Sequence, residues 1–223
     1  MPVMQMAGIV VGLPDMPQLN KPLIEFDTLN QHLHAYGTPF VVAEGESILP
    51  ADKQANQYTI IILQGCASLT RKHNDVLLGF AQAPCVIGLA AGVMPNQTDY
   101  QIATEMQCSG YYLPAAQALE LLEKHHLWRE AFHWMTWQHR VLEMRDNQLV
   151  GSNSYNQIRA SLLTMAKWDE SLRLRVGVMN YIQRRTRISR SVIAEVLAAL
   201  RQGEYIRMHK GKLLSINRLP LDY

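Results

Sequence analysis

Residues 155–216 combine three stretches of helical periodicity with two short strand patterns, and few folds accommodate that order. The helical stretches cover Tyr155–Lys167, Leu172–Arg185 and a third segment between Ser189 and Gly203. A serine before an apolar-periodic run and a glycine after it are typical of the two ends of a helix. The strand patterns Tyr205–Met208 and Lys212–Ile216 enclose His209-Lys210-Gly211 and predict a compact hairpin. Three helices followed by a hairpin predict a winged helix-turn-helix.

Thr186-Arg187-Ile188 forms a tight turn between the last two helical stretches. Two helices joined in this way place the second one in the major groove of DNA, with its N-terminal residues against the bases. The end that would enter the groove displays Arg187, Ser189, Arg190 and Ser191. We therefore expect residues 151–223 to form a DNA-binding domain whose partner is a double-stranded DNA operator.

Each polar residue of this region has a defined chemical use on DNA. Arg190 fits the O6 and N7 acceptors of guanine, and Glu195 can accept a hydrogen bond from the cytosine amine. Ser189 is placed to cap the helix, and a capped helix N-terminus also attracts phosphate. Lys210 and Lys212 of the hairpin are expected to bind phosphates, which adds affinity and salt dependence but little specificity.

The charge of the chain divides between its two parts. Residues 151–223 contain 13 Lys and Arg against 5 Asp and Glu, whereas residues 1–150 contain 8 against 14. The net charge of +2 hides this asymmetry. A basic C-terminal domain favours a polyanionic partner. The alternative is a trihelical domain with a solvated basic face that contacts another protein.

Residues 37–113 predict a β-rich domain. Turn signals recur at short intervals, and between them lie the strand-length segments Phe40–Ala43, Tyr58–Leu63, Ala67–Arg71 and Val76–Phe80. Many short strands with regular turns favour a sandwich, roll or barrel. We expect one short helix over Phe26–Tyr36, since the prolines before it exclude long helices. The chain is therefore predicted as α+β, with a β-domain and N-terminal extension over 1–113.

Residues 114–150 predict a helical segment, with Ala115–Lys124 as a short helix and Leu127–Leu149 as a long one. The long helix has a broad apolar face made of two adjacent stripes. The stripe assigned to dimerisation consists of Leu127, Ala131, Trp134 and Val141, and the adjacent one of Phe132, Met135, Leu142 and Leu149. We expect one side to pack on the β-domain and the other on a second copy of the chain. The alternative is a helix that packs on a single core.

The remaining residues exclude several classes of protein. No apolar run approaches the ~20 residues of a membrane helix, and the N-terminus lacks the basic flank of a secretory signal. Cys66, Cys85 and Cys108 are too scattered for a disulfide framework or a metal cluster. No nucleophile–base motif or phosphate loop is present. We expect a cytoplasmic protein that is not an enzyme and holds no metal or cofactor.

The C-terminal region resembles the DNA-binding domain of the Crp/Fnr superfamily. The resemblance rests on YNQIRASLLTMAK at 155–167, on SRSVIAEVLAALRQGEYI at 189–206 and on the hairpin. It extends upstream through Gly45-Glu46 and Tyr58–Gly65, which are similar to the family's β-roll, and covers about 37–218. More narrowly, the chain resembles the enterobacterial regulators named for inhibiting hydrogen peroxide resistance. The resemblance implies a cyclic-nucleotide-binding-like roll, a long dimerisation helix, a homodimer on a two-fold related operator, RNA polymerase as a further partner and a link to oxidative stress.

The sensory residues of that family are replaced in this chain. Its nucleotide binders carry Gly-Glu-Leu/Ala and then Arg-Ser/Thr-Ala, where this chain has Ile87-Gly88-Leu89-Ala90 and Gln97-Thr98-Asp99-Tyr100. A carboxylate at Asp99 repels a phosphate, so cyclic-nucleotide binding is not expected. Buried structural cysteines are the preferred interpretation, with Cys66 as the candidate if one thiol is redox-active. An adaptor that keeps the fold and binds a protein or small molecule without DNA remains the alternative function.

Overall fold

The computed structural model describes residues 19–94 and 100–221, which form two units of dense internal contacts, 19–143 and 144–221. The boundary between the units falls inside the long helix, and the three-part division at 113 and 150 stays a prediction. The predictions made for the N-terminal prolines before residue 19 and for Gln97-Thr98-Asp99 lie outside the described residues.

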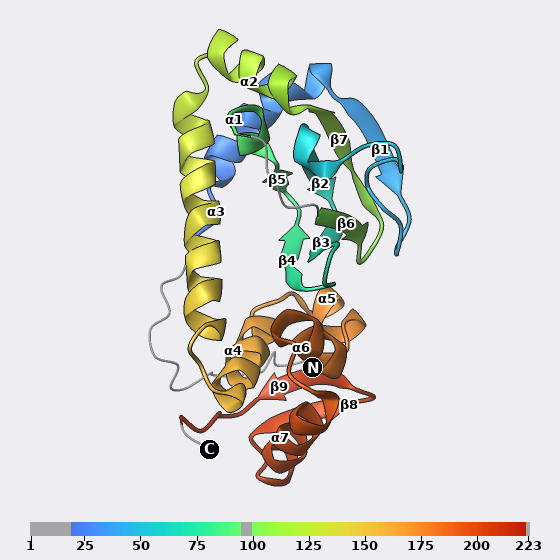
Figure 1. The fold of residues 1–223 in the computed structure, drawn as a ribbon, viewed down its shortest axis with the longest axis vertical. Helices are drawn as coiled ribbons and strands as arrows, with labels where there is room; N and C mark the ends of the chain where they lie inside the picture. The colour runs from blue at the N-terminus through green and yellow to red at the C-terminus, as the bar shows by residue number, and fades with distance from the viewer. Residues whose placement is uncertain (1–18, 95–99, 222–223) are drawn as a thin grey trace, which may run out of the picture. The chain divides into compact units, whose positions relative to one another are not determined.

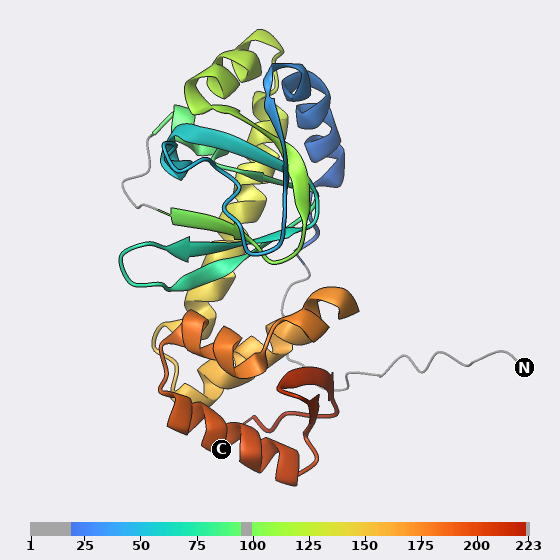
Figure 2. The same ribbon diagram turned by 90° about the vertical axis from the view of Figure 1, so that its right-hand side faces the viewer.

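The N-terminal unit is a β-roll with helices (Figure 1). Its elements are α1 Leu23–Leu33, β1 Thr38–Val42, β2 Tyr58–Gln64, β3 Cys66–Arg71, β4 Leu77–Gln82, β5 Cys85–Ile87, β6 Tyr100–Thr104, β7 Cys108–Pro114, α2 Ala115–Lys124 and the start of α3, Trp128–Leu149. The strands form two antiparallel sheets with the orders β1-β7-β2-β5 and β4-β3-β6. Figure 2 shows them as two layers.

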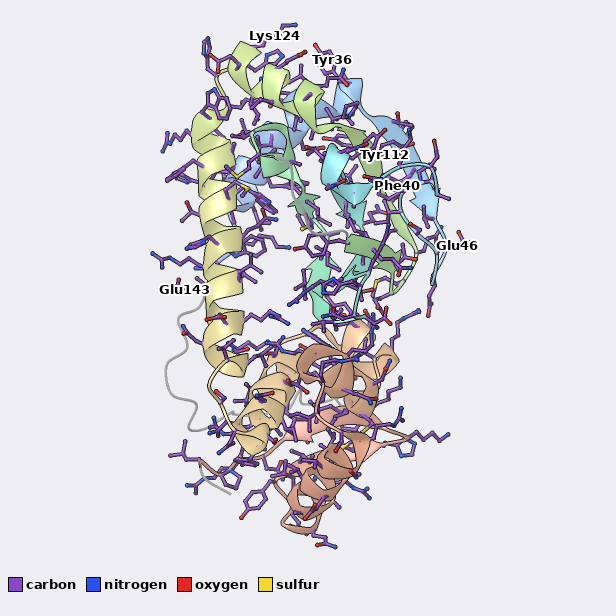
Figure 3. All side chains as sticks on the ribbon, viewed as in Figure 1. Tyr36, Phe40, Glu46, Tyr112, Lys124 and Glu143 are labelled. Atoms are coloured by element: carbon purple, nitrogen blue, oxygen red, sulfur yellow. The ribbon has the colours of Figure 1, made fainter. Side chains whose placement is uncertain are left out.

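At one end of the unit, the Lys124 ammonium lies 6.0 Å from the ring centre of Tyr36 (Figure 3).

The predicted strand at 58–63 forms the centre of the roll. Ile60, Ile61 and Ile62 are all buried, because β2 has neighbours on both edges and apolar side chains on both faces. Gly65 then turns the chain into β3 with a φ of +92°. A Cβ at this position would lie 2.2 Å from the carbonyl oxygen of Gln107, so only glycine fits this turn.

The helix α3 is hydrogen-bonded to β5, a strand at the edge of the roll's four-stranded sheet. The Trp134 indole N–H donates to the carbonyl of Val86 at 3.0 Å, and the Gln138 amide donates to the same oxygen at 2.9 Å. Since β5 is the last strand of its sheet, this carbonyl is free to accept both bonds. Phe26 of α1 packs on Trp134 with ring centres 5.8 Å apart. One face of α3 therefore belongs to the core of its own chain.

The packing of α3 on the roll contradicts most of the stripe that the sequence assigned to dimerisation. Leu127, Ala131 and Trp134 are buried in the core of the roll, and Val141 is half-buried. A side chain enclosed by its own chain offers no surface to a second copy, so Leu127, Ala131 and Trp134 do not fit the dimer role expected of them, while Val141 stays a prediction. The exposed apolar side chains belong to the adjacent stripe, with Phe132 71% and Leu142 54% exposed.

The C-terminal unit consists of α4 Ser154–Ala166, α5 Glu170–Arg175, α6 Val178–Thr186, α7 Arg190–Gln202 and the hairpin β8 Ile206–His209 and β9 Lys212–Ile216. The helix predicted over Leu172–Arg185 was wrong as a single element, because α5 and α6 are separated at Val176 and Gly177. Both residues have extended backbone, and Gly177 precedes α6 as its N-cap. Glycine costs about 1 kcal/mol in a helix interior, which favours the break at this point.

Candidate nucleic-acid interface

The turn between α6 and α7 is held by its own polar groups. Arg187 ends α6 in the left-handed conformation, with φ +65°, and its N–H donates to the carbonyl of Gln183. The Thr186 hydroxyl accepts from the N–H of Ile188 at 3.2 Å. A left-handed non-glycine residue is uncommon and requires such support. The turn thereby brings Arg187 to the surface beside the start of α7.

Ser189 caps α7 as its position in the sequence predicts. Its side-chain oxygen accepts from the N–H of Val192 at 3.4 Å, and the hydroxyl of Ser191 lies 3.1 Å from the same oxygen. The other N–H groups of the first turn have no partner inside the helix, and together they attract anions. Arg190 and Ser191 project from this end and are exposed.

The two faces of α7 differ in chemistry. Ile193, Val196, Leu197 and Leu200 are buried against the unit, which fixes the helix by its apolar side. The opposite face exposes Ser191, Ala194, Glu195 and Ala198. Ser191, Ala194 and Ala198 have short side chains, so the backbone of α7 can approach the floor of a groove closely. Alanine can make an apolar contact with the thymine methyl group, and a glutamate can accept a hydrogen bond from a cytosine amine.

Arg190 is supported by a residue that the sequence analysis missed. A terminal nitrogen of its guanidinium lies 3.5 Å from the side-chain oxygen of Gln183, on α6. This is the outer limit of a hydrogen bond, so the contact orients the guanidinium without immobilising it. The seven-residue separation across a turn gave no local signal for this pair. Ala194 and Ala198 could have been found, because they alternate with the buried positions of α7 at helical spacing.

The hairpin is anchored to the α5–α6 junction by its turn. The carbonyl of Gly211 accepts from the N–H of Val178 at 3.0 Å, and the Lys212 ammonium donates to the carbonyl of Arg175. Lys212 is half-buried, and its ammonium group is engaged in this intramolecular contact. The phosphate-binding role expected of Lys212 is therefore corrected: it anchors the hairpin instead. Lys210 is exposed at the tip, where it and Gly211 have positive φ values of 46° and 76°. Lys210 therefore keeps the geometry of a phosphate contact.

The cysteines lie inside the roll. Cys66, Cys85 and Cys108 are buried and form no disulfide, and burial raises the pKa of the Cys85 thiol to about 11. Burial also raises the pKa of Cys108. A peroxide-sensing thiol needs access and thiolate character, and Cys66 has no exposed surface at all. The structure thus gives no support to Cys66 as a redox site.

Residues 19–94 and 100–221 hold no group of three or more His, Cys, Asp or Glu side chains placed to bind a metal ion. No helix there has the length and apolar composition to cross a membrane.

Sequence comparison identifies the family. Residues 154–221 match the family model described as winged helix-turn-helix DNA binding. The chain is 54% identical over 203 residues to inhibitor of hydrogen peroxide resistance from Escherichia coli, covering 91% of this chain and 98% of that protein. The chain belongs to the inhibitor of hydrogen peroxide resistance family. The family member from Salmonella typhimurium is 52% identical over 208 residues, with coverage of 93% and 100%.

The fold of the chain is similar to that of two solved structures that are named as regulators. The c-di-GMP-responsive global regulator CLP of Xanthomonas campestris superposes with a TM-score of 0.69 at 11% identity, covering 85% of this chain and 99% of that one. A Crp/Fnr-family transcriptional regulator of Thermus thermophilus superposes with a TM-score of 0.56 at 17% identity, with coverage of 80% and 94%. The predicted fold class is confirmed, and the resemblance to Crp/Fnr regulators is confirmed at the level of the fold.

Proposed function

We propose that this chain is a homodimeric, sequence-specific DNA-binding transcription regulator that uses α7 as its recognition helix and works without a cyclic nucleotide. The proposal includes RNA polymerase as a second partner and the cytoplasm as its place of action, since the chromosomal DNA lies there. The observation that carries it is the N-terminal end of α7, where a serine cap, Arg190 and Ser191 are exposed together. Regulation, rather than catalysis, is the activity that this geometry supports.

The proposed DNA contacts divide into two kinds. Arg190, Ser191 and Glu195 face outward from α7 and are assigned to base edges, where a bidentate arginine–guanine pair contributes ~1–3 kcal/mol of discrimination. Arg187, Ser189 and Lys210 flank this surface and are assigned to phosphates. Phosphate contacts set affinity and salt dependence, whereas base contacts set sequence preference.

The proposed dimer uses the exposed face of α3. Seven residues follow a spacing of four and three along the helix: Trp128, Phe132, Met135, His139, Leu142, Asp146 and Leu149. This is the spacing of a two-stranded coiled-coil seam, in which each residue meets its counterpart on the second helix. Phe132 and Leu142 supply exposed apolar surface, while His139 and Asp146 are polar positions within the seam. A second copy of α3 is the partner that matches this periodicity.

The proposal leaves the roll without a nucleotide ligand. Gly88 has a φ of +75°, and a Cβ there would lie 2.3 Å from the carbonyl oxygen of Tyr58, so this glycine is needed for packing. The segment after it forms a short 3₁₀ helix, Leu89–Gly92, where the resemblance would place the missing glutamate. The name of the relatives associates them with hydrogen peroxide, and we extend that association to this chain. The buried thiols make direct oxidation of the roll a weak route for such a signal.

Fluorescence anisotropy distinguishes this function from the alternative adaptor. A regulator binds genomic DNA fragments with an affinity that falls steeply as salt rises, while an adaptor shows no salt-dependent binding. Arg190→Ala is expected to lower affinity for preferred fragments by roughly 5- to 150-fold and to change binding to random DNA little. Arg201→Ala removes an exposed arginine at the far end of the same helix and serves as the matched control. Equal losses in both variants would contradict the assignment of Arg190.

A further inference from the structure

A buried arginine joins the last turn of α3 to the last turn of α6. Arg185 is only 6% exposed. One terminal nitrogen of its guanidinium donates to the Tyr181 hydroxyl at 2.8 Å, and the other donates to the side-chain oxygen of Gln148 at 2.6 Å. Gln148 belongs to α3 and the other two residues to α6. A single guanidinium group therefore connects the ends of two helices.

The contacts of Arg185 differ from those of most buried cations. Both acceptors are neutral oxygens, and its Nε meets no acceptor among the described residues. Taking a cation out of water is costly, and an apolar side chain of similar volume is often as stabilising at such a place. What arginine adds is a planar fork that holds two acceptors in fixed directions. The geometry points to orientation, rather than stability, as the contribution of Arg185.

The contact between Arg185 and Gln148 is linked to the recognition helix through Tyr181 and through the turn between α6 and α7. The Tyr181 ring is buried and packs edge-on against Trp168, with ring centres 4.7 Å apart. Arg185 lies two residues before Arg187, where α6 ends and the chain turns into α7. Since α6 and α7 pack on each other, the direction of α7 follows that of α6. A change at Gln148 is thereby passed to the recognition helix.

We propose that Gln148, Arg185 and Tyr181 form a joint that fixes the angle between the end of α3 and the helix-turn-helix. In a dimer built on α3, two such joints set the separation and rotation of the two recognition helices. The joint then determines which half-site spacing the dimer accepts. This inference rests on the proposed function and concerns the orientation of the two recognition helices, since Gln148, Arg185 and Tyr181 are not among the proposed DNA contacts.

The first test measures orientation without DNA. Spin labels at Asn147→Cys and Gln202→Cys, both exposed positions, report the distance between the end of α3 and the end of α7. The three native cysteines are buried, and labelled protein is diluted into unlabelled protein so that one protomer is observed at a time. Gln148→Ala is expected to broaden the distance distribution at least about twofold. Gln157→Ala serves as the matched control, because that glutamine donates at 2.9 Å to Ser152 and does not touch Arg185. An unchanged distribution in Gln148→Ala overturns the joint.

The second test uses the full-length protein on duplexes that carry two selected half-sites with the spacing varied one base pair at a time. One added base pair rotates the second half-site by about 35°, so a fixed dimer prefers one spacing. Gln148→Ala is expected to flatten this preference and to keep the wild-type affinity for a single half-site, with Arg185→Lys intermediate. A Gln148→Ala protein that keeps the sharp spacing preference overturns the inference. If the wild type binds no DNA, the proposed function fails, and the distance distributions still decide on the joint.

Discussion

The helices α3 and α7 are both half-buried, but their exposed faces differ in the chemistry that they present. On α7 the exposed side chains are short or polar, with Arg190 and a serine cap at one end. On α3 they include the bulky apolar Phe132 and Leu142, at coiled-coil spacing. A short polar face suits the edges of base pairs, whereas a bulky apolar face requires another apolar surface. The difference supports the proposal that α7 binds DNA and that α3 binds a second copy of the chain.

The largest expected effect comes from the buried face of α3. Trp134→Ala removes the fully buried indole, its hydrogen bond to Val86 and its packing on Phe26. Truncating a buried aromatic side chain costs about 3–5 kcal/mol of unfolding free energy. Urea unfolding followed by circular dichroism measures this loss. A cost under about 1 kcal/mol would show that this face of α3 is not part of the core.

A smaller effect is expected from the exposed face of the same helix. Leu142→Asp places a carboxylate in the proposed seam, and it should weaken dimerisation by at least about 30-fold because an unpaired charge would be desolvated there. Analytical ultracentrifugation measures the change. Asn147→Asp adds the same charge at an exposed position outside the seam and should leave the dimer intact. If Leu142→Asp dimerises like the wild type, the exposed face of α3 is not the dimer interface.

The smallest effect is expected at the hairpin. Lys210→Ala removes one proposed phosphate contact at the exposed tip and should reduce the salt slope of DNA binding by about one unit, without changing sequence preference. Lys212→Ala makes a useful contrast, because Lys212 holds the hairpin on Arg175. That substitution is expected to lower the stability of the C-terminal unit. A shift in sequence preference in Lys210→Ala would assign the tip to the bases instead.

The features that the sequence predicted depend on residues that are neighbours along the chain. The features that it missed depend on residues far apart along the chain. The cap at Ser189, the end of α7 at Gly203 and the turn at Lys210-Gly211 depend on neighbouring residues, and all three were predicted. The side of α3 that packs on the roll depends on Val86, 48 residues before Trp134 along the chain, and no local pattern shows it. The contact of Lys212 with Arg175 spans 37 residues, so no local pattern distinguished this lysine from a phosphate-binding one.

Selection from a pool of random duplexes tests most directly whether Arg190 contacts a base. The wild type, Arg190→Ala and Arg201→Ala are each used to enrich bound duplexes, which are then sequenced. We expect the wild type and Arg201→Ala to select the same motif, with a guanine that Arg190→Ala no longer requires while the other positions persist. An identical motif from the wild type and Arg190→Ala would contradict the placement of this end of α7 against the bases.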